Sequence, residues 1–180
     1  ARRCSMSHGR DGIIDRVSDG GRKMSDNELL KKNAENLKMA TVETAKQMER
    51  GVVDIEKLEE MITPETSMIS VMLVNSETGA VMPVKEIAAL KNRINKNIIL
   101  HTDAVQAFGK IKINVKELGV DLMSFSSHKF NGPKGVGALY IKNGVKLPCF
   151  ILGGGQEKGL RSGTENVLGI SAFGVACESF

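Results

Sequence analysis

Residues 121–141 read DLMSFSSHKFNGPKGVGALYI, and this stretch decides the fold of the chain. The apolar run at 121–126 is short enough for a buried strand, and the tripeptide SHK at 127–129 follows it directly. After the Gly132-Pro133 turn signal, a second apolar run occupies 136–141. The stretch therefore predicts two strands joined by a polar turn that carries a lysine.

The same alternation of strand and helix extends towards the N-terminus. Apolar runs at 69–74 (ISVMLV) and 97–102 (NIILHT) predict two more buried strands. Pro83 opens a predicted helix that runs to about Lys96, and 115–119 forms a short helix or turn. Strands that alternate with helices predict an α/β fold with a mostly parallel sheet flanked by helices.

The flanking segments carry less regular signals. A capping box at 25–28 (SDNE) predicts a helix over 26–38, and 40–45 is a possible short strand. Asp54 caps a predicted helix at 54–62, and a last helix begins near Asn166. We expect residues 1–24 to be an irregular lead-in and residues 25–180 to be the folded segment. The first residue is Ala rather than Met, and we expect the chain to be a partial member of a longer protein.

Composition excludes two classes of function. The chain has 180 residues, of which 41% are hydrophobic and 26% charged, and no apolar run approaches the roughly 18 residues that span a bilayer. The net charge is +4, but residues 1–24 hold six basic and three acidic side chains, which leaves +1 for the remainder. With one Tyr and no Trp for base stacking, neither a membrane nor a nucleic acid is expected as a partner.

The cysteines indicate a reducing compartment. Cys4, Cys149 and Cys177 lie far apart and form no CxxC pair, which argues against a zinc ribbon and against a disulfide scaffold. We therefore expect a cytoplasmic protein, with Cys149 and Cys177 serving as core packing.

Polar side chains follow three of the predicted strands at the point where each strand ends. Ser76 comes after 69–74, Asp103 and Gln106 come after 97–102, and Ser126, His128 and Lys129 lie at the end of 121–126. In open α/β sheets a ligand binds in the crevice at the carboxyl ends of the strands. The sequence therefore predicts a binding site at this edge of the sheet.

The residue types narrow the chemistry of that site. A lysine that loses solvation at a strand end favours its neutral, nucleophilic amine, and a nearby carboxylate can keep a pyridine nitrogen protonated. Lys129 with Asp103 is the combination that pyridoxal phosphate requires, with Ser126, His128 and Thr164 as donors for a phosphate. The plainer alternative is a surface lysine in a Gly-Pro turn and a helix-capping aspartate. A metal site at His101, Asp103 and His128 is not expected, because Lys129 would repel the cation.

Four motifs resemble the cysteine desulfurases, which are pyridoxal-phosphate enzymes of aminotransferase class V. They are VNSETG (74–79), HTDAVQAFGK (101–110), SFSSHKFNGPKGVGALYI (124–141) and GGGQEKGLRSGTENV (153–167). The resemblance covers 51–178 and implies that this is part of the large domain of such an enzyme. It also implies removal of sulfur from L-cysteine, which gives alanine and a protein persulfide for iron-sulfur cluster assembly. The implied partners are a second copy of the chain, as a homodimer, and a sulfur-acceptor protein.

The resemblance assigns a role to each candidate residue. Lys129 would hold pyridoxal 5'-phosphate as a Schiff base and move the substrate's Cα proton, while Asp103 pairs with the pyridine nitrogen. Gln106 would bond the phenolic oxygen of the ring. Ser126 and His128 would hold the phosphate, and Thr164 would contribute to the phosphate site of the partner subunit. Ser76 stands near the ring oxygen, where many members have asparagine.

Three further departures leave other readings open. Ser25 stands where the family has a histidine stacked on the ring, the N-terminal phosphate loop is not found in 1–24, and the family's catalytic cysteine falls beyond the last residue. We therefore expect weak cofactor binding and little desulfuration by this chain alone. A selenocysteine lyase, another class V aminotransferase, or a non-catalytic relative that dimerises or binds a partner are the alternatives.

Overall fold

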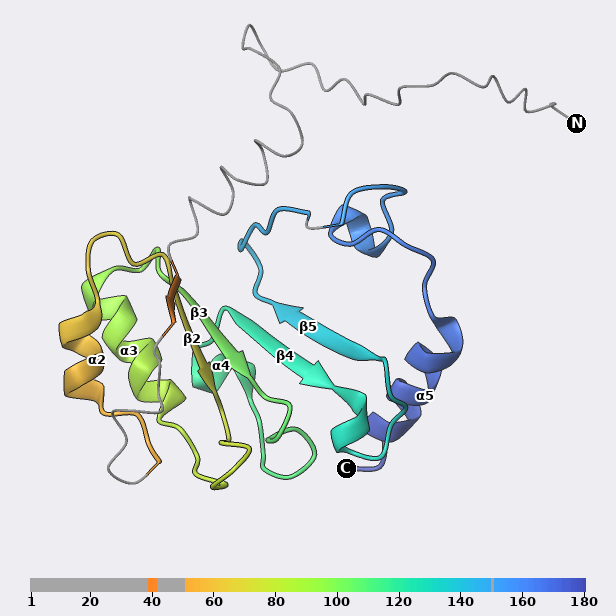
Figure 1. Ribbon diagram of the computed structural model, residues 1–180, viewed down its shortest axis with the longest axis horizontal. Helices are drawn as coiled ribbons and strands as arrows, with labels where there is room; N and C mark the ends of the chain where they lie inside the picture. The colour runs from red at the N-terminus through yellow and green to blue at the C-terminus, as the bar shows by residue number, and fades with distance from the viewer. Residues whose placement is uncertain (1–38, 42–50, 150) are drawn as a thin grey trace, which may run out of the picture. The chain divides into compact units, whose positions relative to one another are not determined.

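The computed structural model of the chain describes residues 39–41, 51–149 and 151–180, all of which belong to one unit, Asn36–Phe180. The helix expected at 26–38 and most of the strand expected at 40–45 lie outside the described residues. The sheet has five strands in the order β1-β2-β3-β4-β5 (Figure 1). The strands are β1 (Met39–Thr41), β2 (Met68–Met72), β3 (Ile99–Asp103), β4 (Leu122–Ser126) and β5 (Gly137–Ile141).

The first four strands are parallel and the fifth is antiparallel, which confirms the predicted mostly parallel sheet. A helix precedes each of β2, β3 and β4: α2 (Ile55–Met61), α3 (Val84–Ile94) and α4 (Val115–Leu118). Right-handed crossovers between strands in sequential order place their helices on one face of the sheet, and α3 contacts both α2 and α4. The turn at 127–136 is too short for a crossover, so β5 returns antiparallel beside β4.

Local sequence explains where the helices begin. The Asp54 carboxylate accepts hydrogen bonds from the Glu56 and Lys57 amides at 3.0 and 3.2 Å, as the predicted cap requires. Asn114 caps α4 in the same way, and Gly119 ends that helix with φ of +71°. The last helix, α5 (Val167–Cys177), begins at Asn166, whose side chain accepts from the Gly169 amide at 3.0 Å.

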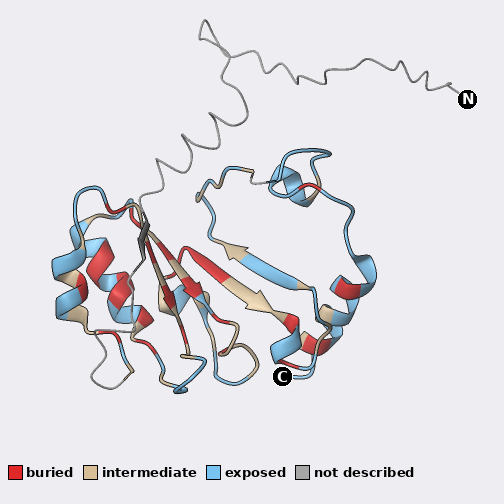
Figure 2. Ribbon diagram, viewed as in Figure 1, coloured by how far each residue is buried: buried red, intermediate tan, exposed pale blue. Residues whose placement is uncertain are grey.

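The core lies between the helices and one face of the sheet. Ile69, Leu100 and Met123 from three neighbouring strands are fully buried against Val84 and Ile87 of α3. Figure 2 shows this face of α3 and the strands beside it as buried, whereas much of β5 and α5 is exposed. Among the described residues, no helix is long and apolar enough to cross a membrane.

Candidate functional site

The carboxyl ends of β2, β3 and β4 meet at one edge of the sheet, the lower edge in Figure 1. Two backbone hydrogen bonds fix the turn after β3 between its neighbours. The Leu73 amide donates to the Asp103 carbonyl at 2.7 Å, and the Ala104 amide donates to the Ser124 carbonyl at 2.9 Å. The candidate residues of β3 and β4 therefore start from a fixed backbone geometry.

The turn after β3 presents Asp103 and Gln106. Asp103 is exposed at the last position of the strand, and its Oδ1 accepts a hydrogen bond from the Val105 amide at 2.8 Å. This bond orients the carboxylate and leaves Oδ2 without a hydrogen bond to any described residue. Gln106 is half-buried, and its Oε1 accepts from Lys110 Nζ at 2.9 Å. Its amide nitrogen remains available to donate to a ligand.

The turn after β4 presents the lysine. Residues Ser127–Lys129 form the 3-10 turn η2. Ser127 is fully buried, and its hydroxyl donates to the carbonyls of Pro133 and of Val136, the latter at 3.0 Å. A Cβ on Gly132 would lie 2.7 Å from the Ser127 Cβ, so only glycine fits there. The Gly-Pro sequence after the lysine is therefore a structural frame that holds this turn.

The polar side chains of the lysine turn point outward. Ser126 Oγ is hydrogen-bonded to His128 Nδ1 at 2.7 Å, so these two proposed phosphate donors lie side by side. His128 and Lys129 are both exposed. Burial at the strand end was expected to remove water from Lys129, but the side chain is exposed to water. The physical reason is that a 3-10 turn projects residues 128 and 129 past the edge of the sheet.

Ser76 and Thr164 do not join this group in the structure. Ser76 Oγ bonds to Glu77 in its own turn at 3.3 Å, and the neighbouring Asn75 side chain accepts the amides of that turn. Thr164 is exposed between η3 (Glu157–Gly159) and α5. In Figure 1 the chain that leaves β5 starts at the opposite end of the sheet from the turn after β4 and then runs back to α5. No hydrogen bond links Thr164 to the other candidates within the described residues.

Sequence reasoning missed a hydrogen-bonded row across three strands. Ser70 Oγ lies 2.8 Å from His101 Nδ1, and His101 Nε2 lies 3.2 Å from Ser124 Oγ. Burial lowers the pKa of His101, and the charge of Asp103 opposes this by raising it. In the sequence, each of these apolar strands has a polar residue at its middle position, but only the strand register brings the three side chains together.

Two further features, a possible metal site and the cysteines, do not add to the candidate site. Within the described part of the chain, no group of three or more His, Cys, Asp or Glu side chains could hold a metal ion. Cys149 and Cys177 are half-buried free thiols rather than core residues, and the Cys149 thiol donates to the Ile151 carbonyl at 2.9 Å. The expectation that both cysteines pack in the core is therefore wrong, because each lies at the edge of the packed region.

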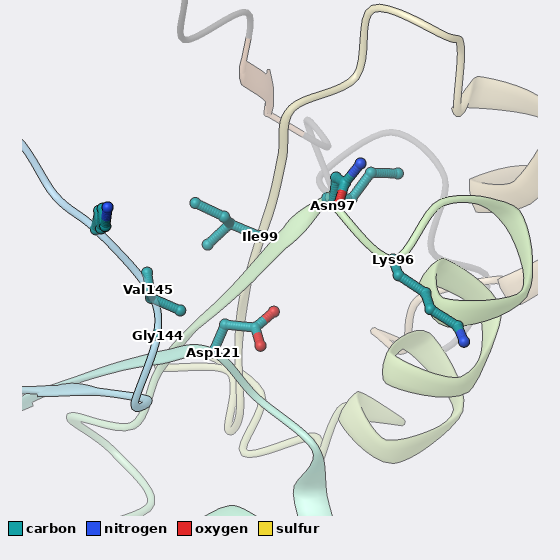
Figure 3. Close-up of a pocket in the computed structure, with 8 residues that line it drawn as sticks. Lys96, Asn97, Ile99, Asp121, Gly144 and Val145 are labelled. Atoms are coloured by element: carbon teal, nitrogen blue, oxygen red, sulfur yellow. The ribbon is translucent and has the colours of Figure 1, made fainter.

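A pocket of about 230 Å³ lies at the amino ends of β3 and β4, away from the candidate residues (Figure 3). Ile99 and Val145 contribute apolar walls, and the Asp121 carboxylate at its base is already bound by lysine ammonium groups. The volume is below the roughly 300 Å³ of typical ligand sites. The carboxyl edge is therefore the better candidate site.

Known proteins share this arrangement. The aminotransferase class-V family model matches residues 26–180. A protein of Clostridium botulinum (strain Hall) named cysteine desulfurase IscS is 55% identical over 130 residues, which are 72% of this chain and 32% of that protein. The chain thus spans about a third of the length of the curated relatives it matches.

Solved structures give the same result. A structure titled NifS-like protein superposes with a TM-score of 0.70 at 48% identity, covering 72% of this chain and 36% of that one. A structure titled SspA in complex with cysteine superposes with a TM-score of 0.68 at 41% identity, covering 72% and 37%. The similarity of sequence and the similarity of fold therefore point to the same proteins.

Proposed function

The chain belongs to the aminotransferase class-V family, and on that premise we propose that it carries the lysine-bearing part of a cysteine desulfurase site. The names of the relatives and the cysteine bound to one structural neighbour support L-cysteine as the substrate. In the proposed reaction the carbon–sulfur bond of cysteine breaks, the sulfur passes to an acceptor thiolate as a persulfide, and alanine is released. The folded segment that carries this chemistry is proposed to be 25–180.

The cofactor of this family is pyridoxal 5'-phosphate, and the donor set at the carboxyl edge fits it. The ring nitrogen needs an anion, and the Asp103 carboxylate has one oxygen fixed by the Val105 amide and the other facing outward. The phosphate needs donors, and the hydrogen-bonded pair of Ser126 and His128 supplies them. The aldehyde of the cofactor needs an amine, and the amine of Lys129 is exposed.

Each side chain has a proposed task. When bound, the cofactor withdraws electrons from the substrate α-carbon. Asp103 keeps the proton on the ring nitrogen, and Gln106 donates to the phenolic oxygen. Lys129 would hold the cofactor and would carry the α-proton of the substrate, while Ser126 and His128 would hold the phosphate. Ser76, in the turn after β2, is proposed to lie near the ring oxygen, and Thr164 is proposed to serve the phosphate of a partner subunit.

One observation carries this proposal: the lysine turn is braced from below by the buried Ser127 and is joined through β4 to the strand that ends on Asp103. A solvated surface lysine in an ordinary loop needs no such bracing. The turn therefore has the rigidity expected of a residue that must meet a cofactor atom at a fixed place.

Trapping the cofactor tests the assignment of Lys129. The chain is incubated with pyridoxal phosphate, reduced with borohydride and digested, and the modified peptide is identified by mass spectrometry. We expect the label on Lys129, no label at that peptide in Lys129→Ala, and an unchanged yield in Lys134→Ala, because Lys134 is an exposed lysine in the same frame. Equal labelling of both variants would mean that the lysine was assigned wrongly.

The proposed setting is a cytoplasmic homodimer that passes sulfur to an acceptor protein in iron-sulfur cluster assembly. Its supports are the free thiols of Cys149 and Cys177 and the exposed apolar side chains of α5. Sedimentation at high micromolar concentration checks the dimer. A single monomeric species would contradict it.

A further inference from the structure

Every phenylalanine among the described residues belongs to one group of touching rings, which we call the aromatic cluster. Phe125 of β4 meets Phe108 with ring centroids 4.9 Å apart at 71°, and Phe108 meets Phe130 at 4.8 Å and 58°. Phe130 also meets Phe173 at 5.4 Å and Phe180 at 5.9 Å, both near edge-to-face. These spacings and angles are the ones that aromatic pairs favour.

Phe130 is the hub of this cluster and directly follows Lys129 in the chain. Its side chain is 3% exposed, and its amide donates to the Ser127 carbonyl at 3.1 Å. The backbone on the C-terminal side of Lys129 is therefore held by the packing of this one ring.

The contact between Phe108 and Phe130 joins the two halves of the proposed cofactor site. Phe108 lies two residues after Gln106, in the turn that begins at Asp103, whereas Phe130 belongs to the lysine turn. The polar side chains of the two turns make no hydrogen bond to each other in the described part of the chain. Beyond the backbone pairing of β3 with β4, the two turns are therefore joined by apolar packing.

Helix α5 and the residues after it close the far side of the cluster. Phe173 and Phe180 pack on Phe130, and a Cβ on Gly109 would come within 3.0 Å of the Phe180 ring and 3.1 Å of the Phe130 Cβ. Most other apolar side chains of α5 are exposed, Leu168 to 85%. The C-terminus also lies beside the lysine turn in Figure 1. The rings are therefore a principal attachment of the C-terminal segment to the site.

We propose that Phe173 and Phe180 are positioning residues: through Phe130 they hold the Lys129 turn against the Asp103–Gln106 turn, so that the docking of the C-terminal segment controls the reaction of Lys129 with pyridoxal phosphate. This inference rests on the proposed function. Of the cluster only Phe125 packs against the buried core between α3 and the sheet, so truncating Phe173 or Phe180 is expected to leave the sheet intact.

The test compares four variants of the full chain. Phe180→Ala removes one ring contact of Phe130, whereas Phe180→Tyr keeps the ring, and its added hydroxyl can reach water because Phe180 is 62% exposed. Leu168→Ala is the matched control, because it truncates an exposed apolar side chain on α5, the helix that carries Phe173 and leads to Phe180. Phe173→Ala removes the second ring and is expected to act in the same direction as Phe180→Ala.

Two measurements separate positioning from general destabilisation. Hydrogen exchange is followed at the amides of Phe130 and Gly132, which both donate to the Ser127 carbonyl, and at Leu100 in the core. We expect exchange at Phe130 and Gly132 to rise about fivefold in Phe180→Ala, as for the loss of one aromatic pair, with Leu100 unchanged. The concentration of pyridoxal phosphate that half-labels Lys129 should rise by about the same factor, and Phe180→Tyr should restore both values.

Each outcome decides a separate point. Unchanged exchange at Phe130 and Gly132 in Phe180→Ala would overturn the inference, as would faster exchange with unchanged labelling. Equal effects in Leu168→Ala would show general loosening of the helix and would also overturn it. A wild-type chain that takes no label at Lys129 would contradict the proposed function, and the control of Lys129 by the C-terminal segment would fall with it.

Discussion

The Lys91 ammonium and the Asp121 carboxylate lie 2.6 Å apart, with their side chains only 4% and 8% exposed. Lys91 Nζ also donates to the Ile98 carbonyl at 2.7 Å, and the Leu100 amide donates to the same carboxylate at 3.0 Å. The ion pair thereby ties α3 to the amino ends of β3 and β4. It stabilises the end of the sheet opposite to the candidate site, so changes to it test the scaffold without touching the site.

Breaking this pair is expected to be costly. Lys91→Met leaves the Asp121 charge buried with less compensation, and we expect the free energy of unfolding to fall by about 3–5 kcal/mol. Lys142→Met is the control, because Lys142 reaches the same carboxylate at 3.0 Å from a side chain that is largely in water. Its expected loss is about 1 kcal/mol or less. Denaturant unfolding measures both, and equal losses would contradict the structure.

The Asp121 carboxylate should also affect how the free energy of unfolding falls at acid pH. Burial raises the pKa of Asp121, but hydrogen bonds from Lys91, the Leu100 amide and Lys142 outweigh it and hold that pKa below its ordinary value. A lowered folded-state pKa contributes stability that is present above about pH 4 and is lost as the pH falls through the folded value. Denaturant unfolding between about pH 2 and 5 should show a flatter acid limb in Asp121→Asn than in the wild type. An identical slope would mean that Asp121 is not linked to folding.

His101 should titrate below the ordinary histidine value. Burial lowers its pKa and the Asp103 charge partly restores it, so Asp103→Asn is expected to lower the pKa of His101 further. Proton NMR of the imidazole signals measures both values against a reference of about 6.5. The unfolded chain takes up the proton first on acidification, so the contribution of the neutral ring to stability is full above about pH 6.5 and declines below it.

A reversed response would show that the carboxylate does not face the ring. His101→Gln is the companion variant, because an amide can still bond to the hydroxyls of Ser70 and Ser124 while it cannot titrate. It should remove the decline in stability below about pH 6.5 and leave the sheet folded.

The bracing of the lysine turn is testable through Ser127. Ser127→Ala removes the hydroxyl that donates to the Pro133 and Val136 carbonyls, and those carbonyls lose a partner in a part-buried place. We expect a loss of about 1–3 kcal/mol in stability and weaker labelling of Lys129 by pyridoxal phosphate. Ser171→Ala, at an exposed position on α5, should change neither quantity. Normal labelling by Ser127→Ala would show that the turn needs no such brace.

Local sequence signals predicted most of the described elements. Asp54 sits before a helix that the structure begins at Ile55, and the apolar run at 97–102 became the strand Ile99–Asp103. Such signals work because caps, turns and short apolar runs depend on near neighbours in the chain. The expectation that Asp103 and Lys129 lie at one edge came from the same reasoning, since parallel strands joined by helices end on the same side.

Those local signals could not predict contacts between residues that are distant in the sequence. The residues next to Lys91 in the sequence do not indicate that Lys91 is buried, because its partner Asp121 lies 30 residues away on another element. The sequence assigned no role to His101, and only the register of β2, β3 and β4 places a serine on each side of it. The exposure of Lys129 likewise depends on the 3-10 turn after β4, which no apolar pattern encodes.

The sequence by itself determined the family and the alternation of parallel strands with helices, because short motifs and apolar runs carry both, and it predicted a site at the carboxyl edge of the sheet. The tertiary structure alone decided the ion pair of Lys91 with Asp121, the serine–histidine row and the ring contacts that join Phe108 to Phe180. Those interactions need side chains from separate elements to meet within a few ångströms. Their existence therefore depends on strand register and helix docking, which are properties of the folded chain.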